Sequence, residues 1–162
     1  MGSYEYGKKD VCEWIRQTFP EESTILDVGA CDGRWRSLLP EYTMDAVEIF
    51  KPYADRLTGY RKVYNVDIAD FRYNWYDLII FGDVVEHMPV DRAQKALKYA
   101  AKRCKDLIIA VPFQYRQGVV DGNIWQAHIQ DDLTPEIFAE RYPGCEVLCD
   151  PGNAYCYYHK KP

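Results

Sequence analysis

Short apolar runs alternate with amphipathic segments along the chain, a pattern that predicts an α/β fold. The runs short enough for buried strands span residues 24–28, 43–48, 62–68, 76–81 and 106–113. The fourth run, Y-D-L-I-I-F, is almost entirely apolar and therefore predicts a central strand that is buried on both faces. Strands that alternate with helices favour a parallel sheet with right-handed crossovers.

The segments between these runs carry start and stop signals for helices. Asp10 and Glu13 form a capping box, which predicts a helix start at Asp10, and Pro20 ends that helix. This helix would cover either one face of the sheet or the mouth of a ligand site. Apolar residues recur at helical spacing over residues 90–104, and Thr134 caps a last helix. Further helices are predicted at residues 34–39 and 52–58.

The end of the chain predicts a β-hairpin. Two segments, 145–149 and 154–161, flank the turn sequence D-P-G-N. The chain has 162 residues and shows no repeat, linker or low-complexity segment. We therefore expect a single domain over residues 1–162, long enough to bury a proper core.

Composition and charge narrow the classes of function. A net charge of −5 argues against nonspecific nucleic-acid binding, because that binding depends on Lys and Arg. No apolar run approaches the length of a membrane span, and the start M-G-S-Y-E-Y lacks the features of a signal peptide, so we expect a cytoplasmic protein. The 6 cysteines form no C-x-x-C pair, and the histidines do not cluster with them at ligand spacing. We therefore expect free thiols and no metal site.

The turn after the first predicted strand, T-I-L-D-V-G-A-C-D-G at residues 24–33, has the layout of a ligand-binding turn. Gly29 permits a sharp turn with no Cβ in the way, and the next helix directs N–H groups towards the crevice at the strand ends. The nicotinamide fingerprint G-x-G-x-x-G requires glycine where this chain has Cys31 and Arg34. Glu48 ends the second strand about 20 residues further along, where a carboxylate can accept from both ribose hydroxyls of an adenosine.

The same turn resembles motif I of the class I S-adenosylmethionine (SAM)-dependent methyltransferases, D/E-x-G-x-G-x-G. Asp27, Gly29 and Gly33 are in register with this motif, and Cys31 replaces its middle glycine. Residues 82–89, G-D-V-V-E-H-M-P, resemble motif IV of the family. The resemblance covers nearly the whole chain. It implies a Rossmann-like, seven-stranded and mostly parallel sheet with helices on both faces and an antiparallel C-terminal hairpin.

The resemblance also implies SAM as the cofactor and S-adenosyl-L-homocysteine (SAH) as the product. The implied cofactor-binding residues are Asp27, Gly29, Ala30, Cys31, Gly33, Glu48, Ile49, Asp67, Ile68, Asp83 and Val84. Asp67 and Ile68 would hold the adenine, with Asp70 as the competing carboxylate. Asp83 and Val84 would line the methionine half of the site.

The candidate catalytic residues are Glu86, His87 and His128. By resemblance, Glu86 and His87 follow the strand end at which the methyl group is transferred; His87 has the alternative role of pinning its loop or capping the next helix. His128 lies in a long polar segment, residues 114–132, which should emerge on the cofactor side because it follows the fifth strand. Its imidazole suits a general base near neutral pH, and the alternative is that His128 only holds its own loop together.

These features favour transfer of a methyl group from SAM to an oxygen of a small-molecule acceptor. No Asn-Pro-Pro-Tyr-like signature of base amino-methylation follows the fourth strand. The site would be either open to a large or tethered acceptor or closed by residues 114–132. Two other classes stay open. One is a SAM-binding scaffold or regulatory subunit without activity, and the other is a nucleotide-binding oxidoreductase that shares the acid at Glu48.

Overall fold

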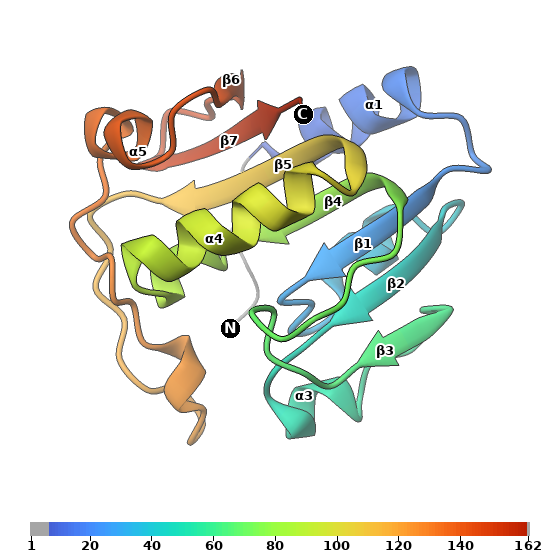
Figure 1. The fold of residues 1–162 in the computed structure, drawn as a ribbon, viewed down its shortest axis with the longest axis horizontal. Helices are drawn as coiled ribbons and strands as arrows, with labels where there is room; N and C mark the ends of the chain where they lie inside the picture. Colours follow the sequence, from blue (N-terminus) through green and yellow to red (C-terminus); the bar gives the residue numbers. More distant parts are fainter. Residues whose placement is uncertain (1–6, 162) are drawn as a thin grey trace.

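The computed structural model describes residues 7–161, which form a seven-stranded sheet with the strand order β3-β2-β1-β4-β5-β7-β6 (Figure 1). The strands are β1 Thr24–Val28, β2 Thr43–Val47, β3 Lys62–Tyr64, β4 Tyr76–Gly82, β5 Cys104–Pro112, β6 Glu146–Cys149 and β7 Tyr155–Lys160. Strands β1 to β5 are mutually parallel, whereas β7 lies antiparallel between β5 and β6. The predicted parallel sheet and antiparallel C-terminal hairpin are therefore confirmed.

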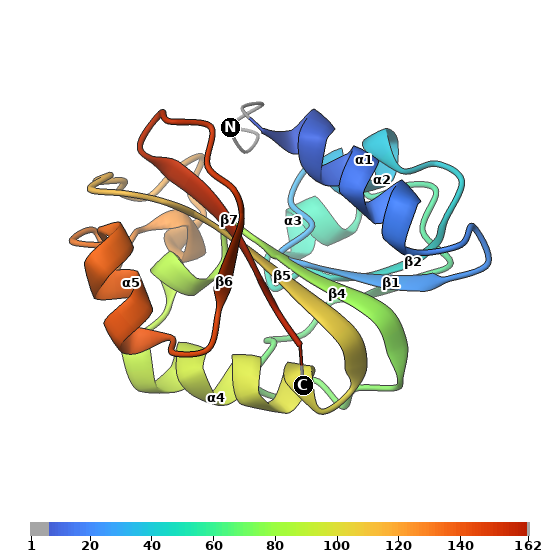
Figure 2. The same ribbon diagram turned by 90° about the horizontal axis from the view of Figure 1, so that it is seen from above.

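Helices cover both faces of this sheet, as Figure 2 shows. Helices α1 Lys8–Thr18, α2 Arg34–Leu38 and α3 Lys51–Ala54 lie on one face, and α4 Val90–Ala101 and α5 Pro135–Arg141 lie on the other. Two short 3₁₀ helices, η1 Val85–His87 and η2 Ile124–Gln126, lie in the segments that follow β4 and β5. The apolar residues of α1 belong to one core cluster and those of α4 and α5 to the other, so α1 serves as cover for the sheet.

Strand β4 lies at the centre of the sheet, between β1 and β5. Its residues Leu78 to Phe81 are all fully buried. A strand covered on both faces has no reason to alternate apolar and polar side chains, so the continuous apolar run at this position reflects burial on both sides.

The start of α1 differs from the prediction because of packing against the hairpin. The helix begins at Lys8 after Gly7, whose φ of 73° is left-handed, and Asp10 lies within the first turn instead of capping it. A Cβ on residue 7 would lie 3.0 Å from Sγ of Cys149. Glycine therefore allows the close approach that sets this helix start, a contact that the local capping signal does not contain.

Other element ends also differ from the prediction. Strand β3 pairs with β2 only as far as Tyr64, so Asp67 lies beyond the strand and not at its end. Helix α4 ends at Ala101, and β5 begins at Cys104, where it pairs with Tyr76 of β4. Helix α3 ends at Ala54, well before the predicted stop. Thr134 does cap α5, because its side chain accepts a hydrogen bond from the N–H of Ile137 at 3.2 Å.

The carboxyl ends of β1 to β5 all point to the same edge of the sheet, on the left in Figure 1. Residues 113–132 leave β5 at this edge, as predicted from their place in the sequence. Within residues 7–161, no helix is long and apolar enough to cross a membrane. The first residues of the chain, where we expect no signal peptide, lie outside the described residues.

Candidate functional site

The turn after β1 contains residues with a left-handed backbone. Gly29 has a φ of 70°, and a Cβ on this residue would lie 2.5 Å from Cγ2 of Val84. Glycine therefore lets the turn approach the segment after β4. Cys31 also has a positive φ, 48°, which costs a residue with a Cβ about 1–2 kcal/mol. Burial raises the pKa of the Cys31 thiol to about 11, so the side chain is a neutral thiol at neutral pH.

Two motif I residues support this turn from behind. Asp27 is buried in β1, and its Oδ2 accepts a hydrogen bond of 2.5 Å from the Tyr60 hydroxyl. Burial raises the pKa of Asp27 to about 7, although the bond from Tyr60 acts in the opposite direction. Gly33, with a φ of 74°, directly precedes α2 as its N-cap. Both predicted residues shape the site without forming its walls.

Glu48 joins the turn after β1 to the end of β2. One of its carboxylate oxygens accepts from the N–H of Cys31 at 2.9 Å, and the other accepts from the N–H of Phe50 at 2.8 Å. Each oxygen keeps a second lone pair for a further donor. Burial raises the pKa of Glu48 above its usual value, although the backbone hydrogen bonds lower it.

Two adjoining cavities lie at this edge of the sheet. The smaller cavity, of about 100 Å³, lies between the turn after β1, the end of β4 and the loop after β5. The larger cavity, of about 250 Å³, extends along the end of β2 towards residues 66–68 and η2. Both cavities are lined by Gly29, Glu48, Asp83, His87 and Gln126. Of the other predicted residues, Ala30, Cys31, Glu86 and His128 line the smaller cavity, and Ile49, Asp67, Ile68 and Val84 line the larger one.

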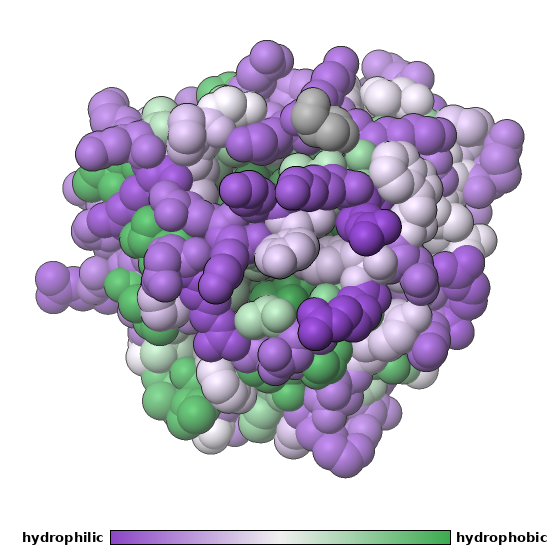
Figure 3. Space-filling model, viewed as in Figure 1, coloured by the Kyte–Doolittle hydropathy of each residue, from purple (hydrophilic) through white to green (hydrophobic). Residues whose placement is uncertain are grey.

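Apolar side chains dominate the larger cavity. Ile49, Ile68 and Val84 form part of its inner wall. Ile124 and Trp125 of η2 close it from the outside, although they are 63% and 44% exposed. Figure 3 shows hydrophobic side chains gathered at the lower left of this face, where η2 lies in Figure 1. The larger cavity therefore suits a flat apolar group with a polar rim.

Asp67 provides a carboxylate at the far end of the larger cavity. Its Oδ1 accepts from the N–H of Ala69 at 2.9 Å, and its Oδ2 pairs with the guanidinium of Arg92 in α4. Arg92 also lines the larger cavity, whereas the competing carboxylate Asp70 is exposed outside the walls. The preference for Asp67 over Asp70 thus agrees with the geometry, although Asp67 follows the strand at a distance.

The segment after β4 directs two carboxylates towards the smaller cavity. Asp83 has a φ of 56°, and its Oδ1 accepts a hydrogen bond of 2.6 Å from the Tyr155 hydroxyl. Glu86 is fully buried, and among the described residues neither of its carboxylate oxygens has a hydrogen-bond partner. Burial, together with the nearby charge of Asp83, raises the pKa of Glu86 well above its usual range.

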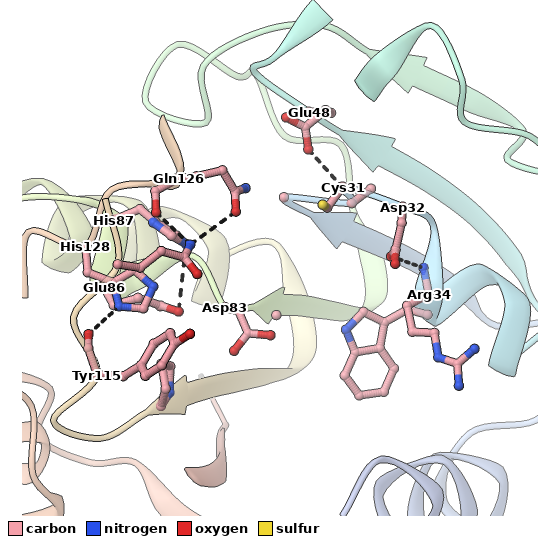
Figure 4. A pocket seen from close by; sticks show the side chains of 16 residues that line it. Cys31, Asp32, Arg34, Glu48, Asp83, Glu86, His87, Tyr115, Gln126 and His128 are labelled. Atoms are coloured by element: carbon pink, nitrogen blue, oxygen red, sulfur yellow. Dashed lines mark hydrogen bonds and ion pairs between the residues drawn. The ribbon is translucent and has the colours of Figure 1, made fainter. Parts of the chain in front are cut away.

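His87 and His128 lie edge to face, with their ring centroids 4.7 Å apart (Figure 4). Nδ1 of His87 lies 3.2 Å from the carbonyl oxygen of Ala127, and Nδ1 of His128 lies 2.7 Å from that of Tyr115. A carbonyl can only accept, so Nδ1 carries the proton in each neutral ring, and Nε2 of His128 is left as an acceptor. The His87 ring also lies against the backbone of Asp83. Burial lowers the pKa of His87 to about 4, assisted by His128 alongside, and burial also lowers that of His128.

The loop after β5 is attached firmly to η1. The N–H groups of Ile129 and Gln130 donate to the carbonyl oxygen of Glu86 at 2.8 and 2.9 Å. The buried side-chain amide of Gln130 donates to the carbonyl oxygens of Val85 and Met88 at 2.7 and 2.9 Å. These bonds place His128 beside His87, although the two residues are far apart in the sequence.

Several wall residues were not predicted. They are Trp35, Arg92, Tyr115, Gln117, Asn123 and Gln126. Arg92 is one of several Lys and Arg residues on the polar side of the helical pattern over residues 90–104, and nothing in that pattern distinguishes it from the others. The loop residues belong to a segment without periodicity. Their only sequence signal is the unusual length of that segment after a predicted strand.

No protein-family model matches the chain, and no curated protein matches it in sequence. Solved structures do match its fold. A SAM-dependent methyltransferase from Clostridium acetobutylicum is 11% identical with a TM-score of 0.72, and the match covers 100% of this chain and 93% of that one. The DhpI–SAM–HEP complex is 14% identical with a TM-score of 0.72, covering 96% and 86%. The mitomycin 7-O-methyltransferase MmcR is 14% identical with a TM-score of 0.67, covering 96% of this chain and 54% of MmcR, so the chain spans about half of that protein. The chain therefore has the fold of the class I SAM-dependent methyltransferases.

Proposed function

We propose that the chain binds SAM across the two adjoining cavities and transfers its methyl group to an acceptor, leaving SAH. The observation that carries this proposal is the junction of the two cavities at Glu48 and Gly29. The Glu48 carboxylate lies there, beside a turn in which a Cβ on residue 29 would collide with Val84. An adenosine with a charged, polar extension matches one apolar and one polar compartment that meet at an acid.

Different residues of the chain would contact different parts of the cofactor. Glu48 would accept from the ribose hydroxyls with its remaining lone pairs. Ile49, Ile68 and Val84 would contact the adenine, and Asp67 would accept from its exocyclic amine. The residues 29–31 and Asp83 would face the methionine half. When bound, SAM supplies a methyl carbon that its sulfonium has already activated, so the protein mainly has to align a nucleophile and exclude water.

The smaller cavity favours a small acceptor with a hydroxyl group. The methionine half of SAM would already occupy part of its volume of about 100 Å³, so little space would be left for an acceptor beside His128. The neutral Nε2 of His128 faces this cavity as a proton acceptor, because Nδ1 is bonded to the carbonyl of Tyr115. The O-methyltransferase MmcR has a similar fold, which is consistent with transfer to oxygen.

Isothermal titration with SAM, SAH and NAD tests the cofactor. We expect micromolar binding of SAM and SAH, no binding of NAD, and a loss of about tenfold or more in Glu48→Ala. Asp70→Ala is the matched control, because it removes a carboxylate of the same region that lies outside the cavity walls. Circular dichroism checks that both variants fold. The proposal would be contradicted if the unaltered chain bound neither SAM nor SAH, or if it bound NAD more tightly than either.

Turnover separates an enzyme from a SAM-binding scaffold. SAH release should appear with at least one class of small hydroxyl compound, and His128→Ala should lower kcat while the affinity for SAM is unchanged. A chain that binds SAM normally but releases no SAH with any such acceptor would be a binding protein.

A further inference from the structure

We propose that Glu86, His87 and His128 bind a divalent first-row transition-metal ion at the wall of the smaller cavity. One potential ligand atom from each of these side chains lies within 4.8 Å of the other two. Nε2 of His87 lies 3.9 Å from Oε1 of Glu86. Figure 4 shows the three side chains gathered on one side of the pocket, across from Cys31 and Arg34.

Hydrogen bonding orients both imidazoles for metal binding. Each Nδ1 faces a backbone carbonyl oxygen, that of Ala127 for His87 and that of Tyr115 for His128. This arrangement leaves the lone pair of each neutral ring on Nε2, although the His87 ring also lies against the backbone of Asp83. Histidine ligands of metal sites are held in the same way, with the other ring nitrogen bonded to a carbonyl or a carboxylate.

Glu86 provides an independent indication of a ligand. Its side chain is fully buried, lines the smaller cavity and has no hydrogen-bond donor among the described residues for either oxygen. Burial of an unsatisfied carboxylate is costly. Nε2 of His87, which lies 3.9 Å from Oε1 of Glu86, has no proton to donate to it when Nδ1 carries the proton of the neutral ring. A bound cation satisfies all three electron-pair donors at once.

The cluster is also held rigidly enough to serve as a site. The loop bearing His128 is bonded to the backbone of Glu86 through Ile129 and Gln130. Nδ1 of His87 contacts the carbonyl oxygen of the residue before His128. A cation therefore has to draw three side chains inward by only a small amount, with no rearrangement of the backbone.

The ligand set indicates the kind of metal. Two imidazoles and one carboxylate suit Mn²⁺, Fe²⁺, Co²⁺ or Zn²⁺ and leave coordination positions open. These positions would face the smaller cavity, where an acceptor hydroxyl can bind. There a bound hydroxyl would lose its proton to solvent water more easily, which would leave the oxygen as a nucleophile. With a cation bound, His128 would act as a ligand in place of the base proposed above, because its Nε2 has only one lone pair. This role of the metal rests on the proposed methyl transfer, whereas metal binding itself does not.

Mn²⁺ titration of the full chain after treatment with a chelator tests the site. Mn²⁺ prefers oxygen and nitrogen ligands, so the free cysteines of the chain compete poorly for it. Electron paramagnetic resonance measures the Mn²⁺ left unbound. We expect a single site per chain, weakened about tenfold or more in His128→Ala and in Glu86→Gln. His159→Ala is the matched control, because that histidine contacts Asp106 and Glu146 outside the cavity walls.

The outcomes separate this inference from the proposed function. SAH binding without Mn²⁺ binding in the unaltered chain would overturn the metal site and leave the proposed function standing. Mn²⁺ binding that depends on Glu86 and His128 but occurs without SAH binding would support the site and contradict the methyltransferase. Mn²⁺ binding of equal strength in all three variants would also overturn the assignment. If a variant fails to fold, the titration of the unaltered chain still decides, since no Mn²⁺ binding there refutes the site.

Discussion

A methyl group added at residue 29 should strain the turn after β1 in two separable ways. In Gly29→Ala, the new Cβ would lie 2.5 Å from Cγ2 of Val84, and alanine would have to adopt a φ of 70°. The left-handed backbone costs about 1–2 kcal/mol, and overpacking costs about 1–3 kcal/mol. Alanine also reduces the conformational freedom of the unfolded chain, which stabilises the folded state by about 0.4–1 kcal/mol. We therefore expect the free energy of unfolding to fall by about 1–5 kcal/mol.

Two other glycines separate these contributions. Gly122 has a φ of 75°, and among the described residues nothing lies within 4 Å of an added Cβ; Gly118 has the same open space without the positive φ. Gly122→Ala should therefore lose only about 0–2 kcal/mol, because the backbone cost is partly offset by the restricted unfolded chain. Gly118→Ala should be neutral or slightly stabilising. Adding Val84→Ala to Gly29→Ala removes the atom that the new Cβ meets, so the pair should show a coupling energy of about 1–3 kcal/mol.

Urea unfolding followed by circular dichroism measures these free energies, and titration with SAH reports the effect on the site. We expect Gly29→Ala to weaken SAH binding as well, because Gly29 lines both cavities. Equal losses of stability in Gly29→Ala and Gly122→Ala would refute the reasoning. So would additive effects of the Gly29 and Val84 substitutions, because the contact between them would then carry no energy.

Three further substitutions test other parts of the site. The pKa of Asp27 is raised to about 7 in the folded chain, so the unfolded chain loses this proton first and stability falls as pH rises from about 4 to about 7. Asp27→Asn should remove that part of the pH dependence, measured by urea unfolding across this range, and an unchanged profile would contradict the assignment. Asp67→Asn should weaken SAH binding about tenfold while Asp70→Asn leaves it unchanged; equal effects in a titration would show that Asp67 has no special role. Gln130→Ala should speed hydrogen exchange in residues 114–132, because its side chain donates to two carbonyls of the η1 segment. Unchanged exchange would mean that other contacts hold the loop.

The sequence by itself determined the elements and the edge at which they meet. The apolar run of β4 and the glycine turn after β1 record burial and backbone geometry, which are local properties of a strand and of a turn. Because parallel strands place their carboxyl ends together, the positions of Glu48 and of the loop after β5 followed from their order along the chain. A local capping signal placed Thr134 at a helix start.

Only the tertiary structure decided which side chains meet. Linear spacing predicts no metal site, yet the loop after β5 folds back on η1 and brings His128 beside His87. Arg92 of α4 pairs with Asp67 in the segment after β3, and a helical pattern cannot relate these two residues. Gly7, not Asp10, starts α1 because the C-terminal hairpin packs against it. These contacts depend on how the segments between strands pack on the sheet. The energy of that packing comes from partners that are distant in sequence, so a local sequence pattern cannot specify the contacts.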